Sequence, residues 1–111
     1  MLDVDESQNG TEIVLQPGEK LEIHLNENPT AGFRWALESV GAPACDLVED
    51  SYESSALTPG AGGSHRWRFQ AKQIGEGRIE LRYRRIWEGQ GASARTFSLR
   101  IRVAKEASAN A

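Results

Sequence analysis

The sequence predicts an all-β protein, an antiparallel sandwich of about seven or eight short strands. The main observation is a strict alternation of apolar and polar residues, which recurs in five separate segments. Because successive side chains of a strand point to opposite faces, this period of two gives each strand one buried and one exposed face. The second observation is that breaks rich in glycine, proline and asparagine separate the segments. No window of useful length follows a helical period.

The N-terminal half contains four predicted strands. The pattern is weak around residues 11–15, whereas in 20–25 three aliphatic residues alternate with a glutamate and a histidine. In 33–40, two aromatic residues and a leucine alternate with charged residues, and 45–53 again shows a weaker pattern. The clear cases are therefore expected to be half-buried strands.

The C-terminal half contains three more predicted strands with clearer alternation. In 64–72, Trp67 and Phe69 alternate with arginine and glutamine. In 78–87 and again in 95–104, aliphatic and aromatic residues alternate with arginines. Seven short strands in about 100 residues are typical of an immunoglobulin-like antiparallel β-sandwich. A five-stranded barrel is the main alternative.

Length and composition set the domain organisation. With 111 residues, 39% of them hydrophobic, one compact core is expected. We expect a flexible N-terminal segment over 1–10, a single domain over 11–104 and a disordered tail over 105–111. Cys45 is the single cysteine, so an internal disulfide is excluded. No cofactor is expected.

The charge is unevenly distributed along the chain. Residues 1–55 contain twelve acidic and two basic residues, and residues 56–111 contain four acidic and eleven basic residues. Either acidic and basic strands pair across the sheets, or a basic surface binds an acidic partner. The net charge of −3 argues against nucleic-acid binding, and no stretch of about 20 apolar residues predicts membrane insertion.

The N-terminal sequence bears on localisation. The acidic, polar run after Met1 has neither the basic start nor the apolar stretch of a secretory signal. We expect a cytoplasmic protein if the chain is complete as written, and a periplasmic or secreted one if a signal peptide was removed.

The connections between strands fall into two groups. If successive strands run in opposite directions, every second connection lies at the same end of the molecule. The connections at one end are short turns, at residues 16–19, 41–44 and 73–77. Those at the other end are longer than turning the chain requires, at residues 26–32, 54–63 and 88–94. Long loops gathered at one end of a rigid sandwich usually carry the function.

Each long loop contains a motif with two interpretations. Residues 28–33 combine a proline, a glycine and a returning aromatic, which gives either a structural turn or a stiff projecting loop. The glycines of 60–63 form either a linker or a segment whose main chain a partner can approach; the Lys-Ser/Thr of a phosphate-binding loop is missing. Trp87, at the end of its strand, is either a core residue or a contact for a partner.

In order and spacing, these motifs resemble those of the chagasin-like inhibitors of papain-type cysteine peptidases. That family carries N-P-T-T-G-Y/F, G-x-G-G and R-P-W in the three loops, and this chain has NPTAGF, GAGG and RIW. Ala31 replaces the second threonine and Ile86 replaces the proline. The resemblance implies a reversible, competitive inhibitor, which is a monomer, catalyses nothing and binds papain-like (cathepsin-type) peptidases.

The resemblance also implies the binding residues and their roles. Thr30 would lie closest to the catalytic groups of the peptidase, the glycine-rich loop would follow the non-primed groove, and Trp87 would stack on the primed side. The residues implied to bind the peptidase are Asn28, Pro29, Thr30, Ala31, Gly32, Phe33, Gly60, Ala61, Gly62, Gly63, Arg85 and Trp87.

Three other functions fit parts of the sequence. A structural or adhesion module of the immunoglobulin type would tolerate changes in all three loops. An enzyme would use Cys45 as a nucleophile, with His24 or His65 as the base. A nucleic-acid or carbohydrate binder would use exposed aromatic and arginine side chains, namely Arg66, Trp67, Arg68, Tyr83, Arg84 and Trp87.

Overall fold

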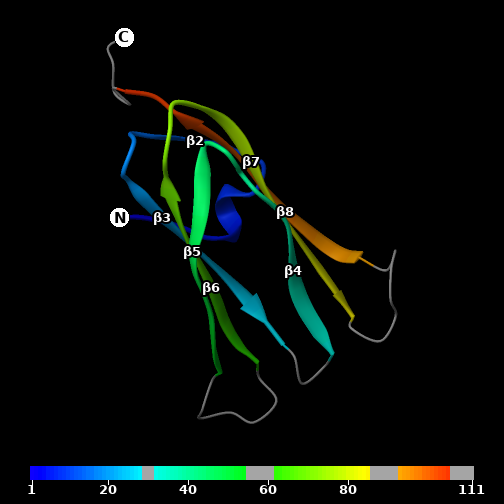
Figure 1. The fold of residues 1–111 in the computed structure, drawn as a ribbon. Coiled ribbons are helices and arrows are strands. Elements are labelled where there is room, and N and C mark those ends of the chain that lie inside the picture. The colour runs from blue at the N-terminus through cyan, green and yellow to red at the C-terminus, as the bar shows by residue number, and fades with distance from the viewer. Residues whose placement is uncertain (29–31, 55–61, 86–92, 106–111) are drawn as a thin grey trace.

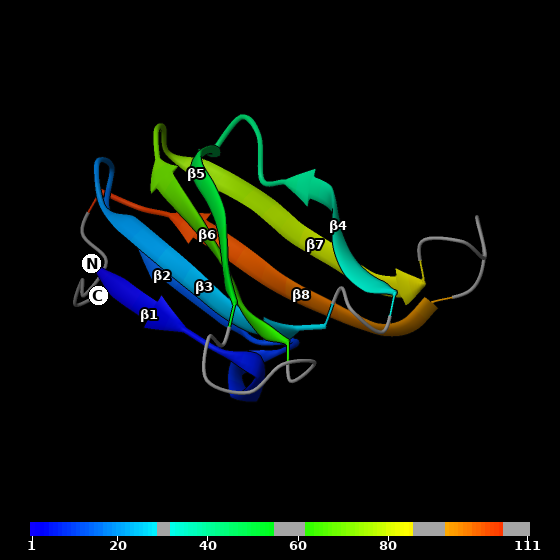
Figure 2. The same ribbon diagram turned by 90° about the horizontal axis from the view of Figure 1, so that it is seen from below.

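The structure, a computed structural model, describes residues 1–28, 32–54, 62–85 and 93–105 (Figure 1). Over these ranges the chain forms two four-stranded sheets packed face to face, seen from below in Figure 2. The first sheet has the order β1 (Leu2–Val4), β3 (Lys20–Glu27), β6 (Gly63–Ala71) and β5 (Cys45–Ser54). The second has the order β2 (Glu12–Leu15), β8 (Ser93–Val103), β7 (Gly75–Arg85) and β4 (Phe33–Val40).

The predicted sandwich is confirmed, and the five-stranded barrel is wrong because the chain closes as two separate sheets. Most neighbouring strands are antiparallel, but β1 pairs with β3 and β2 pairs with β8 in parallel. The start of β7 differs from the prediction: the strand begins at Gly75, whereas the sequence predicts a start at residue 78, and the predicted end at residue 87 lies outside the described residues. In the part of the chain that is described, no helix has the length and apolar character needed to cross a membrane.

The core lies between the sheets and is formed by the apolar residues of the alternating patterns. Trp67, Phe69 and Phe97 are fully buried, and the Trp35 ring meets the Trp67 ring edge to face at a centroid distance of 6.5 Å. Burial of each such side chain contributes about 1.5–3 kcal/mol to folding. The predicted inward and outward faces of β6, β7 and β8 are confirmed by their burial.

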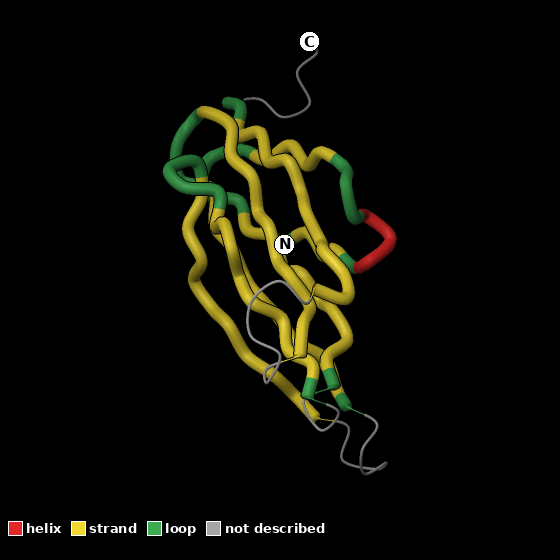
Figure 3. The backbone as a smooth tube through the Cα atoms, turned by 90° about the vertical axis from the view of Figure 1, so that its right-hand side faces the viewer, coloured by secondary structure: helices red, strands yellow, loops and turns green. Residues whose placement is uncertain are grey.

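The N-terminal ten residues depart from the expectation of a flexible segment. Strand β1 extends the first sheet, and the 3-10 helix η1 (Glu6–Gln8) follows it (Figure 3). The Asp5 carboxylate accepts a hydrogen bond from the Ser7 amide at 2.9 Å and one from the Ser7 hydroxyl, and both lower the pKa of Asp5. A strand of three residues is too short to show an alternating pattern, so the sequence did not reveal it.

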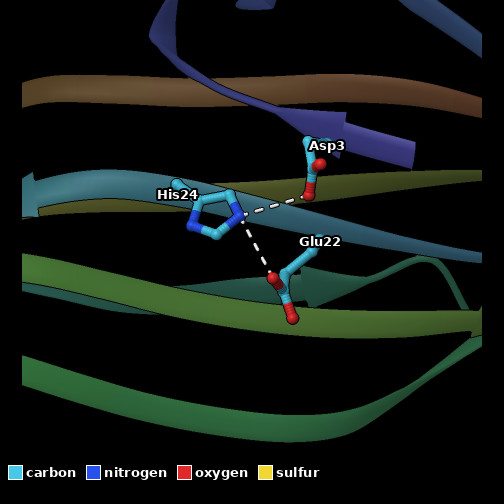
Figure 4. A group of neighbouring side chains, drawn as sticks. All are labelled: Asp3, Glu22 and His24. Atoms are coloured by element: carbon cyan, nitrogen blue, oxygen red, sulfur yellow. Dashed lines mark hydrogen bonds and ion pairs between the residues drawn. The ribbon is translucent and has the colours of Figure 1, made fainter. Parts of the chain in front are cut away.

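A histidine joins β1 to the first sheet. Figure 4 shows the His24 ring between two carboxylates, with Nε2 3.4 Å from Asp3 Oδ1 and 3.1 Å from Glu22 Oε1. Asp3 of β1 lies opposite Glu22 of β3 in the parallel ladder, so the ring of His24, itself a residue of β3, also contacts β1. These contacts help to hold the short strand β1 at the edge of the sheet.

The uneven distribution of charge along the sequence is explained by ion pairs between neighbouring strands of the first sheet. Basic strand β6 lies between the acidic strands β3 and β5. The Arg68 guanidinium lies 2.8 Å from Glu22 Oε2 and 3.2 Å from Glu49 Oε1, and Arg66 lies 3.7 Å from Glu49. For this sheet, the interpretation that acidic and basic strands pair with each other is confirmed.

Candidate functional site

The strand ends that flank the three long loops lie at one end of the sandwich (Figure 1). In the first sheet, the last residues of β3 and β5 both pair with Gly63, the first residue of β6. In the second sheet, Phe33 of β4 pairs with Arg85 of β7, and Arg84 pairs with Ser93 of β8. The grouping expected from alternate strand directions is therefore correct for the strand ends.

The structure describes about half of the predicted binding residues. Those described are Asn28, Gly32, Phe33, Gly62, Gly63 and the backbone of Arg85. Those outside the described residues are Pro29, Thr30, Ala31, Gly60, Ala61 and Trp87, together with the side chain of Arg85. The site is accordingly built below from the segments on which the loops stand.

The loop between β3 and β4 is closed at its base. The Phe33 amide donates a hydrogen bond to the Asn28 carbonyl at 3.2 Å, and Gly32 between them has a φ of +85°. Such a φ is in the left-handed region, which favours glycine. The glycine of the NPTAGF motif is thus required by the backbone, and the chain enters and leaves this loop at neighbouring points.

Tyr83, a residue of β7, links the loop between β3 and β4 to strands β7 and β8, which flank the third long loop. Its hydroxyl accepts a hydrogen bond from the Asn28 amide at 3.0 Å, and its ring stacks on Phe33 at 5.2 Å between centroids. The Arg95 guanidinium of β8 lies 5.0 Å from the Tyr83 ring centroid and 5.7 Å from that of Trp35. This cluster connects β4, β7 and β8 to the beginning of the first long loop.

Replacing Tyr83 with phenylalanine is expected to lower the free energy of unfolding by about 1 kcal/mol. The substitution keeps the aromatic stack but removes the acceptor of the Asn28 amide. Denaturant unfolding of the variant and of the unchanged protein measures the difference. Equal free energies of unfolding would show that this hydrogen bond does not stabilise the base of the loop.

Gly62 and Gly63 lie tightly against the chain itself. A Cβ on Gly62 would lie 2.6 Å from the Glu27 carbonyl oxygen, and a Cβ on Gly63 would lie 2.1 Å from the Glu53 carbonyl oxygen. Both distances are too short for any side chain. The last two glycines of the GAGG motif therefore let β6 begin between β3 and β5.

A cleft of about 530 Å³ lies between the bases of the first two long loops. Its lining includes Asn28 from the first loop, Gly62 from the second and Tyr83 from β7. The residues that line the cleft come from four strands, β3, β5, β6 and β7, and from the adjoining ends of the first two long loops.

Cys45 is not suited to be a nucleophile. It is fully buried, and burial raises the pKa of its thiol to about 11. It pairs with Ala71 at the far end of β6, six residues from His65, which corresponds to roughly 20 Å. His65 therefore cannot act as its base. Neither can His24, which pairs with Arg66, five residues from Ala71 along β6.

Cys45 is expected to resist alkylation by iodoacetamide in the folded protein at pH 8. With a pKa of about 11, only about one thiol in a thousand is ionised at that pH, and the sulfur is buried. Mass spectrometry before and after unfolding measures the difference, and the denatured protein is the control. Rapid modification of the folded protein would contradict this burial.

The stacking platform of a nucleic-acid or carbohydrate binder is also not formed by the described aromatic residues. Trp67 and Tyr83 are both buried, and Arg66 and Arg68 face the acidic strands on either side. Trp87 lies outside the described residues.

Sequence reasoning missed Glu27 altogether and considered His65 only as a possible base for Cys45, so it missed the burial of both residues near the loops. Glu27 and His65 are buried at the ends of β3 and β6 that carry the long loops. The signal was present, because each continues the inward-facing positions of its strand: Glu27 follows Leu25, and His65 precedes Trp67 by two residues.

Known proteins similar to this chain share both its sequence and its fold. The sequence profile of the "Chagasin family peptidase inhibitor I42" matches residues 14–101. Amoebiasin-1 from Entamoeba histolytica is 35% identical over 104 residues, covering 92% of this chain and 99% of that protein. Chagasin from Trypanosoma cruzi is 28% identical over 105 residues, covering 90% of this chain and 96% of that protein.

Solved structures show the same architecture. A cysteine protease inhibitor from Entamoeba histolytica superposes with a TM-score of 0.79 at 17% identity, covering 93% of this chain and 94% of that one. Amebosin superposes with a TM-score of 0.73 at 33% identity, covering 93% and 97%. The family consists of peptidase inhibitors and not of enzymes. From the profile match and the identity to Amoebiasin-1, this chain belongs to the chagasin family of peptidase inhibitors.

Proposed function

We propose that this protein is a reversible, competitive inhibitor of papain-like cysteine peptidases, which inserts its three long loops into the active-site cleft. The observation that carries the proposal is the convergence of the strand ends flanking all three family motifs at one end of a rigid sandwich. The twelve binding residues inferred from the motifs belong to this proposal.

The mechanism requires no chemistry from the inhibitor. The loop at residues 28–33 is held at its base by Tyr83 and by the hydrogen bond between Phe33 and Asn28. In the proposal, Thr30 reaches the catalytic groups, the glycine-rich loop follows the non-primed groove, and Trp87 stacks on the primed side. These contacts at the foot of the loop limit how far the loop can change its shape. In the proposal, no peptide carbonyl of the inhibitor is therefore placed at attack distance from the sulfur of the peptidase.

Preformed loop bases also favour tight binding. Ordering a flexible segment costs free energy at the moment of association, and a segment that is already held loses less. At the second loop, Gly63 pairs with both Glu27 and Ser54, which holds the end of the loop in place. A standard interface of about 1,600 Å² can then give high affinity.

The experiment is a titration of papain with this protein while hydrolysis of a fluorogenic peptide is followed. The expected result is one-to-one inhibition, an apparent inhibition constant that rises linearly with substrate concentration, and full recovery of activity on dilution. A Lys72→Ala variant, altered in the turn at the other end of the sandwich, is the control and should inhibit equally. Absence of inhibition at micromolar concentrations, or cleavage of the protein by papain, would overturn the proposal.

A further inference from the structure

Three ionisable side chains meet beneath the first two long loops. Glu27 is 2% exposed and His65 is 7% exposed, and Asp50 contacts His65 from the neighbouring strand. Taking charged groups out of water costs several kcal/mol for each group unless they are paired. An apolar core would avoid this cost, so the network requires an explanation.

The contacts account for every polar atom of the two buried side chains. His65 Nδ1 lies 2.8 Å from Glu27 Oε1, and His65 Nε2 lies within hydrogen-bond distance of Asp50 Oδ1. The second carboxylate oxygen of Glu27 accepts a hydrogen bond from the Trp35 amide at 2.6 Å. The His65 ring also stacks in parallel on Trp67, with 4.0 Å between centroids, which fixes its orientation.

The four residues that these hydrogen bonds join come from four different strands. Glu27 ends β3 and Trp35 lies in β4, so this hydrogen bond links the two sheets at the free edge of β4. His65 lies in β6 and Asp50 in β5. Strands β3 and β4 flank the first long loop, and β5 and β6 flank the second. The network therefore contains one group from each strand that carries these two loops.

The number of protons follows from the geometry. Both ring nitrogens of His65 face a carboxylate oxygen, and a neutral imidazole has a single N–H. Both hydrogen bonds form only when the network holds one additional proton. Among the described residues, the other ionisable groups that contact the network are Arg34, whose Nε lies 3.8 Å from Glu27 Oε2, and Tyr52, whose ring meets His65 edge to face. Loss of the proton would set a lone pair against a carboxylate oxygen.

We propose that Glu27, His65 and Asp50 are positioning residues, which set the distance between the first and second inhibitory loops. The inference rests on the proposed function, because it explains how two loops from different strand pairs form one binding surface. The contribution of the network is present when the shared proton is bound, and it is lost as the pH rises and the proton leaves.

The test compares Glu27→Gln with Glu22→Gln. Both residues are buried glutamates of β3, but Glu22 pairs with Arg68 on the outer face and contacts neither of the long-loop segments that are described. Both variants are expected to lose stability, whereas only Glu27→Gln should raise the inhibition constant against papain, by about 10-fold or more. Asp50→Asn changes the exposed member and serves if Glu27→Gln does not fold. Equal inhibition constants for Glu27→Gln, or its substitute, and Glu22→Gln would overturn the proposal.

Inhibition constants measured over a series of pH values distinguish a positioning role of the network from a purely structural one. The ratio of the inhibition constants of His65→Gln and the unchanged protein cancels the pH dependence of the peptidase itself. This ratio should fall as the pH rises, because the unchanged protein then loses the shared proton and, with it, one of the two hydrogen bonds of His65. A ratio that does not change with pH would contradict the shared proton.

A measurement without the peptidase separates this inference from the proposed function. Hydrogen exchange at the Phe33 and Gly63 amides should be faster in Glu27→Gln than in Glu22→Gln, with a difference of about 10-fold or more. If the unchanged protein fails to inhibit papain, the proposed function fails, and this exchange difference still tests the network. Equal exchange in the two variants would overturn the positioning role.

Discussion

Replacing Trp87 with alanine is expected to raise the inhibition constant against papain by roughly 30- to 1,000-fold, which corresponds to about 2–4 kcal/mol of binding free energy. Trp87 follows Arg85, the last described residue of β7, by two positions in the sequence and lies outside the described residues. In the proposed function this large aromatic contacts the peptidase, and tryptophan is enriched among interface hot spots. Because that function assigns Trp87 to the interface and not to the core, its loss should change the free energy of unfolding by less than about 0.5 kcal/mol.

The control for Trp87→Ala is a tryptophan that belongs to the core. Trp67 is buried and contacts Trp35, so Trp67→Ala should lower the free energy of unfolding by about 3–5 kcal/mol. Denaturant unfolding and inhibition titration of both variants separate the two roles. If Trp87→Ala destabilises the protein as strongly as Trp67→Ala and leaves inhibition unchanged, Trp87 is a core residue.

Replacing Gly63 with alanine is expected to lower the free energy of unfolding by about 1–3 kcal/mol and also to weaken inhibition. The new Cβ would lie 2.1 Å from the Glu53 carbonyl oxygen and 2.7 Å from Ser54 Cα, both of which are backbone atoms of β5. Strands β5 and β6 would have to separate where they carry the second loop. Thermal unfolding and titration of papain measure the two consequences.

A glycine at the other end of the sandwich provides the matched comparison. Gly18 has a φ of +91° and open space around it, so Gly18→Ala strains the backbone and costs about 1 kcal/mol. Gly18 lies in a short turn, and the inhibition constant of Gly18→Ala should equal that of the unchanged protein. If Gly63→Ala matches the unchanged protein in both stability and inhibition, the tight approach of β5 to β6 does not hold.

Much of the fold could be predicted because alternation reports directly on the side-chain positions of a strand. Trp67 and Phe69, for example, were predicted to face inward, and they are buried. The pattern was weak in β5 because the register shifts between Leu47 and Glu49, which interrupts the period of two. Local sequence therefore predicts regular strands well and irregular ones poorly.

The candidate site could be predicted in part. The spacing of the motifs and the alternation of strand directions placed the strand ends of three loops together, which the pairing of Phe33 with Arg85 and of Glu27 with Gly63 confirms. The partner of Glu27 could not be predicted, because the Trp35 amide reaches it from the other sheet. Contacts between sheets depend on tertiary packing, which has no local sequence signal.

Hydrogen exchange of the protein with and without papain locates the surface that binds the peptidase. On binding, we expect protection in the segments 28–33, 60–63 and 85–87, and no change in the turns at 16–19, 41–44 and 73–77. Protection confined to those turns, or spread over the outer face of either sheet, would contradict a binding surface formed by the three long loops.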